Sequence, residues 1–134
     1  MKWAFHFALI LISLCGCTHT PIDCARFRKG NFILHYNFKQ HTTNFYISRG
    51  DSTQTEININ TSESSKYTIS WVTDCSYETR LVETLFTFPS SKKSYQRALP
   101  KKTTIIRTAE DYYIFRTTSA GTNLVLTDTM WVDK

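Results

Sequence analysis

Three polar residues around one predicted turn are the best candidates for side chains that act together. Arg49 precedes the turn-forming residues Gly50 to Ser52, and Gln54 and Glu56 follow them on the next predicted strand. In a two-stranded hairpin such positions face one another, so the guanidinium could pair with the carboxylate. The cluster fits either a polar binding site, for example in the mouth of a barrel, or a structural ion pair that fixes the hairpin. We favour the structural ion pair.

The remaining bases and nucleophiles form no pattern that predicts catalysis. His19, His35 and His41 have no acid and nucleophile beside them in the sequence, although folding could bring distant residues together. The chain has no Gly-x-Ser-x-Gly elbow, glycine-rich phosphate loop, His-Glu-x-x-His motif or calcium-binding loop. We therefore expect no enzymatic activity, no catalytic residue, no metal and no cofactor.

The N-terminus has the features of an export signal. Lys2 supplies a positive charge, and residues Trp3 to Leu14 are apolar except for His6 and Ser13. A run of this length is typical of a signal peptide and is too short to span a bilayer. It ends in Leu14-Cys15-Gly16-Cys17, which resembles the bacterial lipobox.

The lipobox resemblance implies a defined processing of the chain. Residues 1–16 would be removed as signal peptide, Cys17 would carry a diacylglycerol, and its new amino group would receive a further acyl chain such as palmitate. Three chains, at about 0.8 kcal/mol per buried methylene, anchor a protein stably. Thr18 stands where Asp would retain a lipoprotein in the inner membrane, so we expect the outer membrane if the source has two membranes. The alternative is an ordinary cleaved signal with incidental cysteines.

Cys24 and Cys75 are the cysteines left for the exported domain. In an oxidising compartment they predict one disulfide, which closes a loop of about 50 residues and contributes roughly 4 kcal/mol in the chain-entropy model. A zinc site is disfavoured because no further ligand lies at the usual spacing. Trp71 could form the wall of a ligand site, but we expect it to pack over the disulfide, with Asp74 capping the adjacent turn.

Composition limits the chain to one modest domain. The 134 residues are 41% hydrophobic, 14% aromatic and 20% charged, which suffices for a packed core and excludes large catalytic scaffolds. The net charge is +5, with basic clusters at residues 26–29 and 92–102. Such clusters can meet nucleic acid or anionic lipid, but a solvated loop is the commoner explanation. In an exported protein we expect no nucleic-acid partner.

Apolar residues alternate with polar ones along most of the chain after residue 30, which predicts about eight strands. These strands begin near residues 31, 45, 53, 67, 77, 103, 112 and 122. Residues 90–100 break the alternation and could form a short helix. The links are short, so we expect antiparallel neighbours and an all-β meander, closed as a small lipocalin-like barrel or folded as a two-layer sandwich. Residues 17–23 would be a lipidated tether and residues 24–134 a single β domain.

Several short sequence motifs in the chain resemble those of a family of small exported bacterial proteins of unknown function. They are Cys24 with Phe27-Arg28-Lys29-Gly30-Asn31-Phe32, Ile47-Ser48-Arg49 with Gln54-Thr55-Glu56, and Trp71-Val72-Thr73-Asp74-Cys75-Ser76-Tyr77-Glu78. The resemblance covers Cys24 to about Val82 and implies a disulfide and a fold, but no activity. The Phe-x-x-Gly-x-Phe start is also similar to the Gly-x-Trp opening strand of lipocalin-like barrels, with Phe32 in place of Trp.

The expected function is a membrane-anchored lipoprotein of the cell envelope whose β domain is a non-enzymatic binding module for a small apolar or amphipathic ligand. The alternative is a structural or protein-interaction lipoprotein with a solid core. Small eight-stranded barrels allow both, since their interior is just wide enough to be filled by side chains or to hold one small ligand. The deciding feature is whether the apolar face lines a cavity or packs tightly. Its members are Phe32, Leu34, Tyr36, Ile57, Ile59, Ile69 and Trp71.

Overall fold

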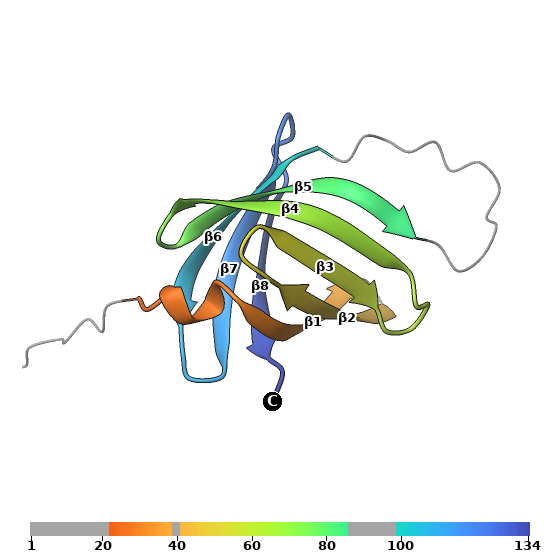
Figure 1. Ribbon diagram of the computed structural model, residues 1–134, viewed down its shortest axis with the longest axis horizontal. Coiled ribbons are helices and arrows are strands. Elements are labelled where there is room, and N and C mark those ends of the chain that lie inside the picture. Colours follow the sequence, from red (N-terminus) through yellow and green to blue (C-terminus); the bar gives the residue numbers. More distant parts are fainter. Residues whose placement is uncertain (1–21, 39–40, 86–98) are drawn as a thin grey trace, which may run out of the picture.

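The computed structural model describes residues 22–38, 41–85 and 99–134. They form eight antiparallel strands that follow one another around a closed barrel, in which the last strand pairs with the first (Figure 1). One 3-10 turn, η1 (Ala25–Phe27), precedes them. The strands are β1 (Gly30–Phe38), β2 (His41–Arg49), β3 (Thr53–Asn58), β4 (Ser64–Thr73), β5 (Ser76–Leu85), β6 (Lys101–Thr108), β7 (Tyr112–Ser119) and β8 (Val125–Val132).

This architecture confirms the predicted all-β meander and selects the barrel over the sandwich. The predicted break at residues 90–100 lies almost entirely outside the described residues. Within them η1 is the one helical element, and the sequence did not predict it. None of the described residues belongs to a helix long and apolar enough to cross a bilayer. All strands, η1 and the disulfide cysteines lie between Cys24 and Val132.

The two ends of the barrel are built differently. At one, which we call the closed end, η1 lies against the connections at residues 50–52, 74–75 and 109–111 (Figure 1). The other, which we call the open end, carries the connections at residues 59–63 and 120–124 and the strand ends next to residues 39–40 and 86–98. This division follows from the meander, because alternate connections of an up-and-down barrel meet at the same end.

Tightly packed side chains fill the closed end. The largest fully buried ones, each at most 2% exposed, are Phe27, Phe32, Ile47, Ile105 and Tyr113. The Tyr113 ring lies 5.0 Å from the ring of Phe27 and 5.9 Å from that of Phe32, measured between centroids. Burying a side chain of this size stabilises a fold by about 1.5–3 kcal/mol. This half of the barrel is therefore a packed core, and Phe32 belongs to it.

Two seams of the barrel, where β1 meets β8 and where β5 meets β6, are paired only near the closed end among the described residues. β1 pairs with β8 from Phe32 to Leu34, although β1 pairs with β2 along its whole length. β5 pairs with β6 from Ser76 to Thr79. Beyond Leu34 and Thr79, these strands continue toward the open end with no pairing across the seam among the described residues. Where β1 meets β8, the described backbone is therefore paired at the closed end and not at the open end.

Strand β3 turns its polar face toward the barrel interior. The register pairs Ile47 with Glu56, which places Glu56 and Gln54 on the inner side with the buried Ile47. Ile57 therefore points outward, and Ile59 is 53% exposed. The expectation that these two isoleucines face the interior was wrong. The pairing register decides which face of a strand points inward along its whole length. In β3 it points Gln54 inward, where Gln54 hydrogen-bonds to Arg49 and Glu56.

Candidate functional site

A buried cation forms part of the floor of the barrel. Arg49 is 3% exposed, and four N–H donors of its guanidinium have partners. Nε donates to Gln54 Oε1 at 2.7 Å, Nη1 to the Phe27 carbonyl at 2.9 Å, and Nη2 to the hydroxyls of Tyr77 and Tyr113, both at 2.9 Å. A guanidinium has five N–H donors, so little capacity is left for a ligand. Arg49 is a structural residue.

Aromatic groups surround the same guanidinium. Its Cζ lies 4.7 Å from the ring centroid of Tyr77 and 5.0 Å from that of Phe32. Burial lowers the pKa of Arg49, but the Tyr77 and Tyr113 hydroxyls outweigh that effect and the pKa lies above its ordinary value. Burial also raises the pKa of Tyr113 well above its ordinary value. The floor therefore combines a permanent cation with a neutral phenol.

Gln54 links this cation to a carboxylate. Its Oε1 accepts from Arg49, and its Nε2 donates to Glu56 Oε1 at 2.7 Å. The three polar residues singled out in the sequence thus lie together on the inner face. Among the described residues Arg49 forms no direct ion pair with Glu56. The amide of Gln54 spans the gap, so the two charges offset one another through a hydrogen-bonded chain.

Above this chain, toward the open end, the barrel holds a cavity of about 100 Å³ that opens to solvent on one side. Its apolar wall comes from the first two and last two strands and consists of Leu34, Ile47, Phe115, Leu126 and Met130. Its polar wall carries Gln54, Glu56, Tyr77, Thr79, Thr103 and Thr117, with Lys101 beside them. One wall can take hydrocarbon and the other can hydrogen-bond, which is the make-up of a site for an amphipathic molecule.

The polar wall is internally ordered. Burial, together with the negative charge of Glu56, raises the pKa of Tyr67 to about 12. The Lys101 ammonium lies 5.9 Å from the centroid of the Tyr67 ring. The hydroxyls of Thr103 and Thr117 hydrogen-bond to one another at 2.7 Å. Hydrogen bonds thus hold several polar groups of this wall in place.

Trp71 lies outside this cavity. Its ring centroid is 4.8 Å from that of Tyr77, and the Arg28 guanidinium carbon lies 4.9 Å from the Trp71 ring. Trp71 and Cys75 both pack against the buried core cluster. Trp71 thus lies at the closed end, where it also lines a surface pocket with Arg28, Lys29 and Asp51.

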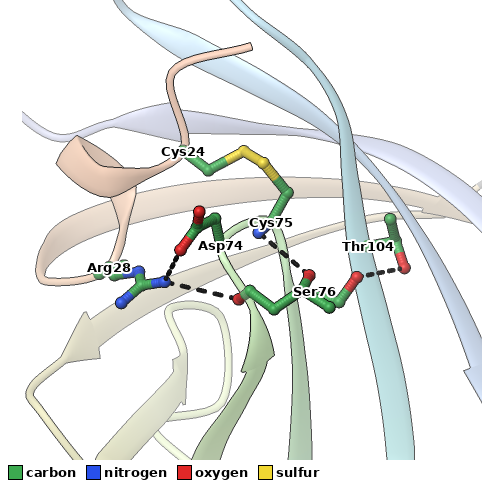
Figure 2. Close-up of a disulfide and its surroundings, with 7 residues drawn as sticks. Cys24, Arg28, Asp74, Cys75, Ser76 and Thr104 are labelled. Carbon is green, nitrogen blue, oxygen red and sulfur yellow. Dashed lines mark hydrogen bonds and ion pairs between the residues drawn. A yellow bond between two sulfur atoms is a disulfide. The ribbon is translucent and has the colours of Figure 1, made fainter.

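The predicted disulfide between Cys24 and Cys75 is confirmed, with Cα atoms 5.3 Å apart. Figure 2 shows that it ties the segment entering η1 to the turn between β4 and β5. Asp74 does not cap this turn as expected, because its carboxylate accepts from Arg28 at 3.0 Å. The Thr73 hydroxyl accepts from the Cys75 amide at 3.3 Å instead. The shorter Thr73 side chain reaches the Cys75 amide, whereas the Asp74 side chain points to solvent.

Other sequence candidates lie apart from the cavity. His35 hydrogen-bonds to Asn44 on the outer surface, and His41 is exposed at the start of β2. His19 and the proposed lipid-bearing Cys17 fall outside the described residues. No group of three or more His, Cys, Asp and Glu that could hold a metal occurs in the described part of the chain.

Lys101 is the charged cavity residue that the sequence did not reveal. It was counted in a basic cluster of a solvated loop, because the strand was expected to begin at Thr103. The strand begins at Lys101, and the alternation of Lys101, Thr103 and Ile105 puts all three on the inner face. Extending that alternation by two residues would have found it. Comparison with protein-family models, curated proteins and solved structures found no match for this chain.

Proposed function

We propose that this protein is a membrane-anchored lipoprotein whose barrel is a non-enzymatic binding module for a small amphipathic molecule. The observation that supports the binding role is the two-walled cavity of about 100 Å³ at the open end. An apolar cavity of about 150 Å³ holds the six non-hydrogen atoms of benzene, so roughly four non-hydrogen atoms fit here. Because the cavity opens to solvent, the rest of a longer ligand can extend outward.

The position of the N-terminus is compatible with such an anchor. The chain enters the barrel at the closed end, where Cys24 is bonded to Cys75 (Figure 2). If Cys17 carries lipid, the tether of residues 17–23 spans at most about 24 Å when fully extended. The closed end then lies toward the membrane and the open end away from it. A ligand could reach the cavity without crossing the lipid surface of the proposed outer membrane.

Native mass spectrometry tests the binding role directly. The domain beginning at Thr18 should be exported to an oxidising periplasm, purified without detergent and measured before and after denaturation. A reproducible adduct that leaves on denaturation, and whose mass matches an amphipathic metabolite, is the expected result. NMR titration with 1-hexanol provides the second readout, with shifts confined to residues on the cavity wall. Bare protein that shows no shift up to millimolar hexanol would contradict the proposal.

A structural or protein-interaction lipoprotein is the second candidate, favoured by an exposed apolar run. Leu124, just before β8, is 76% exposed, and Val125, the first residue of β8, is 58% exposed. Contiguous exposed apolar residues on a strand mark association surfaces. A concentration-dependent dimer in sedimentation equilibrium that Leu124→Ser together with Val125→Thr abolishes would support this candidate. A monomer at all concentrations would leave the binding module as the better explanation.

A further inference from the structure

The charges around the cavity do not balance. Arg49 and Glu56 offset one another through Gln54 on the floor and polar wall. Lys101 adds a second cation to the cavity wall, and among the described residues no carboxylate oxygen lies within 4.0 Å of its ammonium. Lys101 is half-buried as a residue, so its stem can pack on the wall while its ammonium remains available to an anion that enters the cavity.

The surroundings of Lys101 make it a defined position within the site. It is the first residue of β6, at the open end, and pairs with Thr79 on one side and Ser119 on the other. Lys101 lines the cavity, and its ammonium lies 5.9 Å from the centroid of the Tyr67 ring. The Glu56 carboxylate on the same wall accepts from Gln54, and among the described residues it forms no ion pair with Lys101.

We propose that the molecule bound in the cavity is an anionic amphiphile, a short-chain carboxylate, with its carboxylate at Lys101 and its hydrocarbon against Leu34, Ile47 and Met130. This inference rests on the proposed binding function and names the ligand class of that site. A carboxylate would supply the counter-charge that Lys101 lacks. The threonine hydroxyls of the polar wall could donate hydrogen bonds to its second oxygen.

The test compares three probes of matched length, namely hexanoate, 1-hexanol and hexylammonium. Each is titrated by NMR into the domain beginning at Thr18, which contains every strand and the disulfide. A charge-assisted contact should make hexanoate bind about tenfold or more tighter than hexanol, and hexylammonium weakest. Raising the salt concentration should reduce the advantage of hexanoate only slightly, because a partly buried pair is poorly screened.

The variants separate Lys101 from the general charge of the protein. Lys101→Met keeps the length of the side chain and removes its charge, so the preference for hexanoate over hexanol should disappear while hexanol binding stays. Lys102→Met is the matched control, because this adjacent lysine is exposed on the outer face of the same strand. It should leave the preference intact, and Lys101→Arg should restore most of it.

The possible results distinguish this inference from the function on which it rests. Equal affinity for hexanoate and hexanol, or tightest binding of hexylammonium, would overturn the anionic ligand class but keep the binding module. An unchanged hexanoate preference in Lys101→Met would overturn the role of Lys101. If none of the three probes shifts a cavity resonance, the binding module itself is wrong.

Discussion

At the residue scale, the organising feature of this protein is a buried arginine without a directly bonded carboxylate. Arg49 satisfies its charge through a carbonyl, an amide and two phenols, and reaches Glu56 only through Gln54. Such a network is stable only when every member has a partner, because each unpaired buried polar group costs about 1–3 kcal/mol. The network specifies which side chains form the floor below the cavity.

Replacing Arg49 with Met should be among the most destabilising changes in the domain. The substitution leaves the Phe27 carbonyl and the hydroxyls of Tyr77 and Tyr113 without their donor and Glu56 without its balancing charge. We expect a loss of about 3–5 kcal/mol in the free energy of unfolding, measured by urea denaturation. Arg116→Met, at an exposed position on the outer face of β7, is the control and should change it by less than about 0.5 kcal/mol. A loss below 1 kcal/mol for Arg49→Met would contradict this account.

Tyr67 and Tyr113 should make the fold sensitive to high pH. Burial raises the pKa of Tyr67 to about 12 and that of Tyr113 well above its ordinary value. Above pH 10 the unfolded chain loses these protons while the folded protein keeps them, so stability falls as pH rises. The contribution of half-buried Tyr67 is present below pH 10 and is lost between pH 10 and 12, by about 1–2 kcal/mol after allowing for solvent screening.

Urea midpoints measured at pH 8 and pH 11.5 check this dependence. Tyr67→Phe should reduce the alkaline loss of stability, because it removes one of the two titrating groups. Tyr46→Phe serves as the control, since Tyr46 lies on the outer face of β2. Equal slopes for the wild type and Tyr67→Phe would show that Tyr67 does not contribute.

At the element scale, the closed end depends on how η1 joins β1. The chain must reverse between Phe27 and Phe32 so that both rings pack in the same core. Gly30 makes this possible with a φ of 130°, a backbone conformation that residues with a Cβ rarely adopt. The disulfide and the Arg28–Asp74 ion pair then hold η1 against the turn between β4 and β5 (Figure 2).

Gly30→Ala should therefore destabilise the domain by about 1–3 kcal/mol through backbone strain. The added methyl itself has room, since the nearest atom of Phe32 would lie at 3.6 Å. Gly50→Ala is the matched control, because Gly50 does not have a positive φ and its added Cβ would make only ordinary contacts with Thr53. Thermal unfolding of both variants measures the difference, and equal melting temperatures would argue against strain at Gly30.

At the scale of the whole molecule, the barrel separates a solid half from a hollow half. The closed end carries the packed rings, the buried arginine and the disulfide, whereas the open end carries the cavity and the seams that remain unpaired among the described residues. This arrangement explains how so small a domain could combine stability with a binding site. The proposed lipid anchor would place the solid half next to the membrane.

The proposed anchor predicts that Cys17→Ala abolishes both lipid labelling and membrane retention. Cells fed a radioactive fatty acid should label the wild-type protein and leave the variant unlabelled, because the sulfur that accepts the diacylglycerol is absent. Cys15→Ala is the control and should be labelled normally, since a small residue suits that lipobox position. Unchanged labelling of Cys17→Ala would overturn the lipobox interpretation while leaving the barrel unaffected.

The strand pattern, the meander and the disulfide could all be predicted from the sequence, because alternation with period two, short links and paired cysteines are local or countable features. Which face of β3 points into the barrel could not be predicted from the sequence. Ile57 and Ile59 looked like core residues, but the register that buries Ile47 beside Glu56 turned them outward. Local pattern identifies the two faces of a strand, whereas contacts with distant strands decide which one is buried.

The sequence by itself thus determined the class of fold and the two cysteines, Cys24 and Cys75, that form its disulfide. The tertiary structure alone decided that Arg49 is enclosed by Tyr77 and Tyr113, which lie far away in the sequence. It also decided that Lys101 borders a cavity instead of a solvated loop. The physical reason is that a cavity is the volume left over when all eight strands have packed, and no single segment of the chain encodes that volume.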